Sequence, residues 1–113
     1  MRPRTHRARA YTPDQILHVI LSYNPCEFEV LFNDYSEFSC DCHEGFWRCT
    51  WWFPHAYNDP RRQTIYFDTD KELVDYLKGK MRRGVIEARI LRDGEVRHII
   101  SFPRVREWQA SPE

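Results

Sequence analysis

The chain has 113 residues, of which 42% are hydrophobic and 30% are charged. This is the size and composition of one globular domain with a single core. No segment reaches the roughly 18 consecutive apolar residues of a membrane span, and the first ten residues lack the apolar stretch of a secretory signal. We therefore expect a cytoplasmic protein without membrane contact, with a flexible basic arm over 1–10, one domain over 11–103 and a polar tail over 104–113.

The 17 basic and 17 acidic residues cancel, but they are segregated along the chain. Residues 10–47 hold seven acids and no Lys or Arg, whereas residues 48–113 hold 13 bases and 10 acids. Such segregation bears on partners and on association rates rather than on the fold. The arm carries four arginines and no acid: Arg2, Arg4, Arg7 and Arg9. An arm of this kind suits contact with nucleic acid or with an acidic partner, and a solvated tail is the alternative.

The first expected element is a short helix over about residues 13–23. Thr12 is a good N-cap, Pro13 suits the first helical position, and Gln15 completes a capping box. Pro25 cannot continue the hydrogen-bond ladder, so the helix should end before it.

Alternation of apolar and polar residues then predicts three strands, over residues 27–32, 37–42 and 47–53. Glu44 and Gly45 are expected to form a two-residue turn between the second and third strands. That turn places Cys40 opposite Cys49 and sorts apolar and polar side chains onto separate faces. A slip of one residue would mix the two faces, so we expect this register.

The second half is expected to hold a loop over 54–62, a strand over 64–67, a helix and a final hairpin. The helix should begin at Thr69 or Asp70 and end before Gly84. The resulting order, α-β-β-β-β-α-β-β, indicates an α+β fold: an antiparallel sheet of about six strands with two helices packed on one face.

For the final hairpin we expect a three-residue loop over 92–94, with Gly94 in the left-handed conformation. This loop would place Ile90 opposite Val96 and Ala88 opposite His98. His98 would then face the core as a hydrogen-bonded histidine.

The cysteines lack the C-x2-C pairs that are typical of zinc sites. They are Cys26, Cys40, Cys42 and Cys49. The expected register places Cys40, Cys42 and Cys49 on one face, where we expect them to be small core thiols, with Cys40 and Cys49 reduced and facing each other. A zinc site on these cysteines and a disulfide between Cys40 and Cys49 are the alternatives, and no cofactor is expected.

No nucleophile elbow, P-loop, zinc-protease motif or dinucleotide-binding motif is present. We therefore expect no enzyme, although a small metal-independent nuclease built from His, Arg and Tyr is an alternative.

The aromatic run over 46–53 is the most unusual segment. Alternation places Trp47 and Trp51 in the core and directs Phe46 and Trp52 outward, near Arg48. Exposed aromatics beside arginine are typical both of surfaces that stack nucleobases and of protein interfaces. The neighbouring acids would repel phosphate, which favours a protein partner.

These observations lead to the hypothesis of a non-enzymatic protein-binding module. Its acidic and aromatic surface would dock on a basic site of a nucleic-acid-acting protein, as anti-CRISPR inhibitors of phages and mobile elements do. The residues expected to bind are Glu29, Glu37, Asp41, Glu44, Phe46, Arg48 and Trp52. The alternative is a nucleic-acid-binding protein that uses the basic arm and the Arg-rich C-terminal half.

Overall fold

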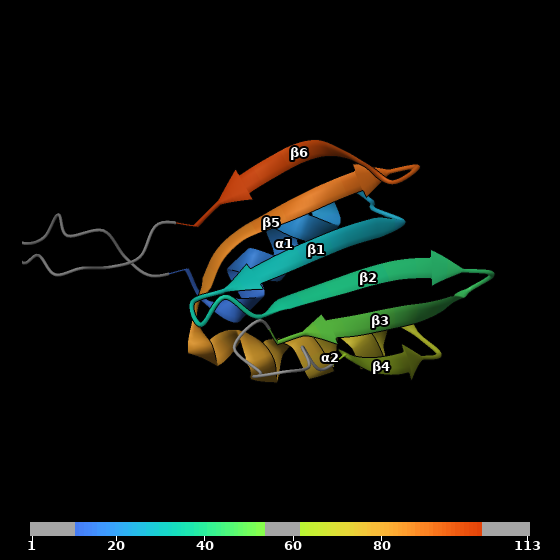
Figure 1. Cartoon of the computed structure of the whole chain (residues 1–113), viewed down its shortest axis with the longest axis horizontal. Coiled ribbons are helices and arrows are strands. Elements are labelled where there is room, and N and C mark those ends of the chain that lie inside the picture. Colours follow the sequence, from blue (N-terminus) through green and yellow to red (C-terminus); the bar gives the residue numbers. More distant parts are fainter. Residues whose placement is uncertain (1–10, 54–61, 103–113) are drawn as a thin grey trace, which may run out of the picture.

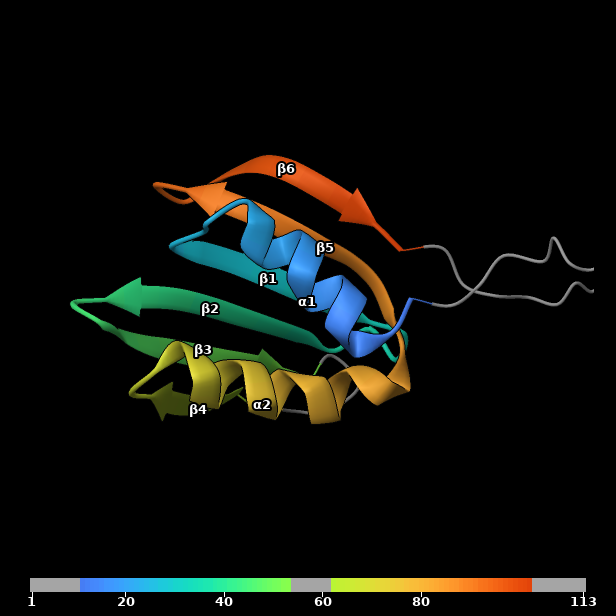
Figure 2. The ribbon, with the colours of Figure 1, turned by 180° about the vertical axis from the view of Figure 1, so that it is seen from behind.

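The structure is a computed structural model, and it describes residues 11–53 and 62–102. Six antiparallel strands form one sheet in the order β4-β3-β2-β1-β5-β6, and the two α-helices lie on one of its faces (Figures 1 and 2). The elements are α1 (Pro13–Ser22), β1 (Glu27–Phe32), β2 (Glu37–His43), β3 (Phe46–Trp52), β4 (Arg62–Phe67), α2 (Asp70–Lys80), the 3-10 turn η2 (Met81–Arg83), β5 (Val85–Arg92) and β6 (Glu95–Ser101). The predicted fold class and element order are confirmed. The expected arm, tail and most of the loop before β4 lie outside the described residues.

Both helices are capped by threonines that the sequence indicates, Thr12 and Thr69. The Gln15 backbone N–H donates to Thr12 Oγ1 over 3.1 Å, and the Thr12 N–H donates to Gln15 Oε1 over 2.9 Å, which is the expected capping box. At the start of α2 the Glu72 N–H donates to Thr69 Oγ1 over 3.2 Å. Gly84, with a φ of 94°, ends η2 before β5 begins.

The core lies between the helices and the sheet, and it is rich in aromatic rings. The rings of Phe38 and Trp51 have centroids 4.6 Å apart, and both residues are almost fully buried. The indole N–H of Trp51 donates to the Tyr76 hydroxyl over 2.8 Å, and that of Trp47 donates to Asp70 Oδ1 over 2.8 Å. The two buried tryptophans therefore satisfy their donors through α2, which ties that helix to β3.

The β2–β3 hairpin has the predicted register. Asp41 lies opposite Arg48, and Cys40 lies opposite Cys49. The exposed fractions of Cys40 and Cys49 are 1% and 0%, and both are free thiols. The expected face-to-face pair of core thiols is confirmed.

The predicted register of the last hairpin is wrong. The strands are joined by a two-residue loop, with Arg92 opposite Glu95, and a bulge then shifts the pairing so that Ile90 lies opposite His98 and Ala88 opposite Ile100. Arg97 is the extra residue, since it has no partner on β5.

Two further expectations for this hairpin have different outcomes. Gly94 does have a positive φ, of 80°. His98 is not a core residue, because it is exposed and its ring lies against that of Tyr23, with centroids 4.7 Å apart.

Candidate functional site

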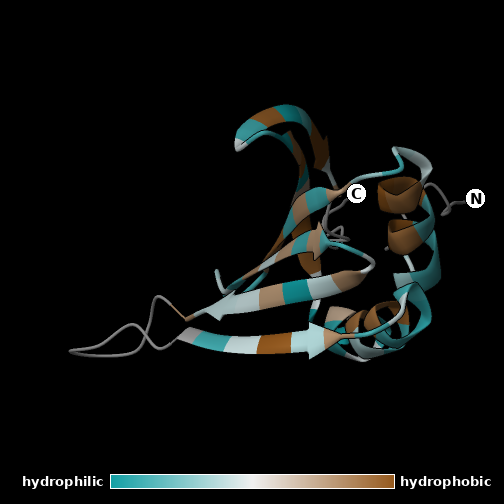
Figure 3. Cartoon of the chain, turned by 90° about the vertical axis from the view of Figure 1, so that its right-hand side faces the viewer, coloured by the Kyte–Doolittle hydropathy of each residue, from teal (hydrophilic) through white to brown (hydrophobic). Residues whose placement is uncertain are grey.

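One face of the sheet carries both helices, and the described residues leave the opposite face uncovered (Figure 3). We call this uncovered side the open face. Side chains alternate along each strand. On β1, β2 and β3 the buried residues therefore point into the core, and the residues between them point to the open face. The residues that the sequence assigned to binding and that lie on the open face are Glu29, Glu37, Asp41, Phe46, Arg48 and Trp52.

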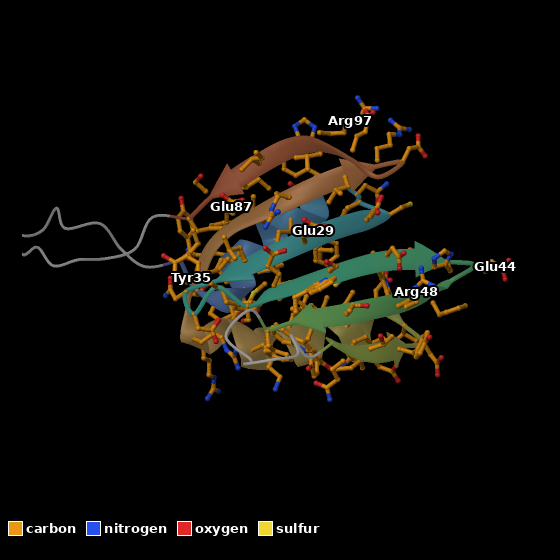
Figure 4. The ribbon with its side chains drawn as sticks, in the orientation of Figure 1. Glu29, Tyr35, Glu44, Arg48, Glu87 and Arg97 are labelled. Atoms are coloured by element: carbon orange, nitrogen blue, oxygen red, sulfur yellow. The ribbon has the colours of Figure 1, made fainter. Side chains whose placement is uncertain are left out.

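Glu44, the remaining predicted binding residue, lies elsewhere. It occupies the turn at the end of the β2–β3 hairpin, with a φ of 48° (Figure 4). Its side chain is therefore apart from the carboxylates in the middle of the open face.

The centre of the open face is an arginine surrounded by glutamates. Arg89 of β5 lies 3.2 Å from Glu29, 3.5 Å from Glu37 and 3.2 Å from Glu87, and its side chain is only 21% exposed. Its Nε is buried and outside hydrogen-bonding geometry toward Glu87, so charge rather than a formed hydrogen bond holds that contact. One guanidinium thus faces three carboxylates, which leaves a local charge of 1 − 3 = −2.

The electrostatics of Glu29 show that this cluster is not fully compensated. Burial raises the pKa of Glu29, the nearby charges of Glu37 and Glu27 raise it further, and the attraction of Arg89 only partly opposes them. The ionised form of Glu29 is therefore less stable, relative to the protonated form, than that of a solvent-exposed glutamate. A cation brought to this side chain from outside would stabilise its charge.

A second polar cluster lies toward the end of the β2–β3 hairpin. Arg48 Nη2 is 3.1 Å from Asp41 Oδ2 and 3.2 Å from His43 Nε2, and that same His43 nitrogen is 3.3 Å from Asp41 Oδ2. One imidazole nitrogen cannot accept from Arg48 and donate to Asp41 at the same time. Whether Nε2 carries a hydrogen therefore decides which of the two neighbours His43 binds.

The open face is hollowed between β1 and β4. The hollow has a volume of about 360 Å³, and its polar lining comes from Glu27, Glu29, Ser39, Asp41, Arg48, Thr50, Thr64 and Tyr66. Tyr66 is 62% exposed and Trp52 is 36% exposed on the same face. The Phe46 and Tyr66 rings have centroids 6.2 Å apart. We call this hollow, with its aromatic border, the acidic groove.

Sequence reasoning did not single out Glu27, Tyr66 or Glu87 as site residues. Alternation along β4 and β5 contained the signal for both Tyr66 and Glu87. Tyr66 lies between Ile65 and Phe67, which pack in the core, and Glu87 precedes the buried Ala88. What the pattern lacked was the pairing of β1 with β5, which brings Glu87 and Arg89 beside Glu29.

The cysteines do not form a metal centre in the part of the chain that the structure describes. No group of three or more His, Cys, Asp or Glu side chains there is placed to hold a metal ion. Burial raises the pKa of the Cys40 thiol, and its neighbour Cys49 raises it further, so this thiol stays protonated.

Comparison with known proteins does not place this chain in a family. It matches no protein-family model, and neither curated proteins nor solved structures give a significant match. Within residues 11–53 and 62–102, no helix is both long and apolar enough to cross a lipid bilayer.

Proposed function

We propose that this protein is a non-enzymatic protein-binding module that holds a basic segment of a partner protein against the open face of its sheet. The partner in this proposal is a protein that acts on nucleic acid, and the module is an inhibitor of the kind that phages and mobile elements carry. One observation carries the proposal: the uncovered face combines excess negative charge with exposed aromatic rings around the acidic groove.

The charge excess is counted from the side chains of β1, β2, β3 and β5 that point to this face. Two guanidiniums, of Arg48 and Arg89, oppose five carboxylates, which gives 2 − 5 = −3. The carboxylates are Glu27, Glu29, Glu37, Asp41 and Glu87. A basic surface that normally holds phosphates presents Arg and Lys at similar spacing, so a row of carboxylates competes with nucleic acid for it.

The aromatic rings supply the second part of the proposed recognition. Trp52 lies opposite Glu37, and Tyr66 lines the acidic groove. An arginine or lysine that reached either exposed ring would gain about 0.5–1 kcal/mol from the cation–π contact. Aromatic side chains are also the usual anchors of protein interfaces. Charge would therefore set the rate of encounter, and the rings would slow dissociation.

A displacement assay tests the proposal. The probe is a labelled single-stranded oligonucleotide bound to an arginine-rich peptide, and fluorescence anisotropy reports the free oligonucleotide when this protein is added. We expect displacement that weakens as salt rises. The variant Asp41→Lys should displace at least about tenfold less well, which corresponds to about 1.4 kcal/mol.

The matched control is Asp75→Lys on α2, which changes the net charge equally but on the helix side of the sheet, where Asp75 pairs with Lys71. Displacement by this control should equal that of the wild type. Trp52→Ala should mainly speed the release of the peptide. Direct binding of the oligonucleotide by the protein, or equal losses for Asp41→Lys and Asp75→Lys, would refute the proposal and favour a nucleic-acid-binding role.

A further inference from the structure

The four cysteines form two opposed pairs, one within the sheet and one at its end. Cys40 of β2 lies opposite Cys49 of β3. On the other side of β2, Phe28 lies opposite Cys40, and two residues further along the Cys42 N–H donates to the Cys26 carbonyl over 2.8 Å. Cys26 therefore lies opposite Cys42, immediately before β1 begins.

Opposed residues of antiparallel strands have the spacing that a disulfide needs. Their Cα atoms are about 4.5–5.5 Å apart, and disulfides span about 4.4–6.8 Å between Cα atoms. A backbone hydrogen bond joins Cys26 and Cys42, and hydrogen-bonded pairs have the larger of the two Cα–Cα distances found between antiparallel strands. That distance is close to the commonest Cα–Cα distance of disulfides. Backbone placement thus permits a bond within each pair.

Access to solvent separates the two pairs. Cys40 and Cys49 are enclosed in the core, whereas Cys26 is exposed and Cys42 is half-buried. Cys26 and Cys42 also line the same cavity of about 600 Å³, at the end of the sheet where β1 begins between the β2–β3 and β5–β6 hairpin tips (Figure 1). A cavity of this volume is in the range that holds small molecules.

We propose that Cys26 and Cys42 form a redox-active dithiol that becomes an intramolecular disulfide by exchange with a small-molecule disulfide, while Cys40 and Cys49 remain reduced in the core. The Cys26 thiolate attacks one sulfur of the reagent, whose S–S bond breaks and releases one thiolate. The Cys42 thiolate then attacks the Cys26 sulfur and displaces the second thiolate. The two protons of the cysteines pass to the two released thiolates, and the protein has given two electrons to the reagent.

Cys26 takes the role of first nucleophile because it is the more exposed of the two thiols. Cys42 resolves the mixed disulfide because it lies directly opposite and needs no strand movement to do so. The bond joins the segment between α1 and β1 to the end of β2.

The experiment treats the folded, reduced full-length chain with oxidised glutathione and follows it by mass spectrometry of the acid-quenched protein. We expect the wild type to lose the mass of two hydrogens, and peptide mapping to find Cys26 linked to Cys42. Cys42→Ser should stop at the first step and keep one glutathionyl group on Cys26. Cys26→Ser should react at least about tenfold more slowly, since only the less accessible thiol remains near the surface.

Circular dichroism of each variant establishes that it is folded. The same reaction in denaturant, where all four thiols are accessible, shows how fast each thiol reacts without the protection of the fold. A native cross-link between Cys40 and Cys49 would overturn the proposal. So would a stable glutathionyl adduct on the folded wild type, or the absence of any reaction at Cys26.

Discussion

Replacing Arg89 with alanine tests whether the arginine at the centre of the open face supports the fold. Its side chain is 21% exposed, and its guanidinium lies within 3.2–3.5 Å of three carboxylates. An exposed ion pair contributes about 0–1 kcal/mol, and removing one partner of a buried pair costs about 3–5 kcal/mol. Arg89 lies between these limits, so we expect Arg89→Ala to lower the free energy of unfolding by about 2 kcal/mol.

Arg48→Ala is the matched control, measured by urea denaturation alongside Arg89→Ala. Arg48 is 48% exposed and contacts one carboxylate, that of Asp41, so its loss should lower the free energy of unfolding much less than the loss of Arg89 does. Added salt should reduce the deficit of Arg89→Ala, because it screens the repulsion among the glutamates left behind.

The pH dependence of Arg89→Ala gives a second readout. Burial already raises the pKa of Glu29 in the folded state, and Arg89 is the group that opposes this rise. Without Arg89 the folded state binds the Glu29 proton still more tightly than the unfolded state does. The deficit should therefore shrink as pH falls from neutral through the raised pKa of Glu29. A deficit no larger than that of Arg48→Ala, or one that grows on acidification, would refute this account.

Two further predictions concern the turns. Gly94→Ala should lower the free energy of unfolding by about 1 kcal/mol, because the residue has a φ of 80° but the added Cβ meets open space. Gly84→Ala should cost more, because the residue has a φ of 94° and the added Cβ would also collide with the Asn33 side chain. Equal melting temperatures for the two variants would contradict the structure. Asp34 accepts hydrogen bonds from the Ser36 N–H (2.9 Å) and hydroxyl (2.6 Å). Burial raises the pKa of Asp34, but those bonds and Arg83 outweigh it and leave the pKa lowered. Because the Asp34 side chain is 53% exposed, solvent weakens these contacts, and Asp34→Ala should lower the free energy of unfolding by about 0.5–1 kcal/mol at neutral pH. The difference from the wild type should narrow as pH falls through that lowered pKa, as thermal unfolding against pH would measure.

The two hairpins differ in how far the sequence determines their registers. In β2–β3 the turn Glu44-Gly45 and the burial of one face agree, and a slip would expose Trp47 or Trp51. In β5–β6 that constraint is missing, because β6 is an edge strand with almost all its side chains exposed. A bulge at Arg97 then costs little hydrophobic burial, and alternation alone does not reveal it.

The candidate site shows the same division between local and long-range information. Alternation placed Glu29, Glu37 and Asp41 on the open face, because each strand sorts its own side chains. The partial neutralisation of these acids comes from Arg89, which reaches them only because β1 pairs with β5 across most of the chain. Strand order of this kind is a property of the whole sheet, so the local pattern overestimated how free the acids are.

Strand β2 contributes to both proposals, and different readouts keep them separate. Asp41 points to the open face and, like Cys42, lines the cavity at the end of the sheet, whereas the Cys42 side chain packs against the core. Replacing a thiol with a hydroxyl at Cys42 changes no charge on the open face, and reversing the charge of Asp41 removes no thiol. A loss of displacement activity in Asp41→Lys therefore bears on the binding face alone, and the trapped adduct in Cys42→Ser bears on the dithiol alone. Either proposal can fail while the other stands, because adjacent residues of one strand face opposite sides of the sheet.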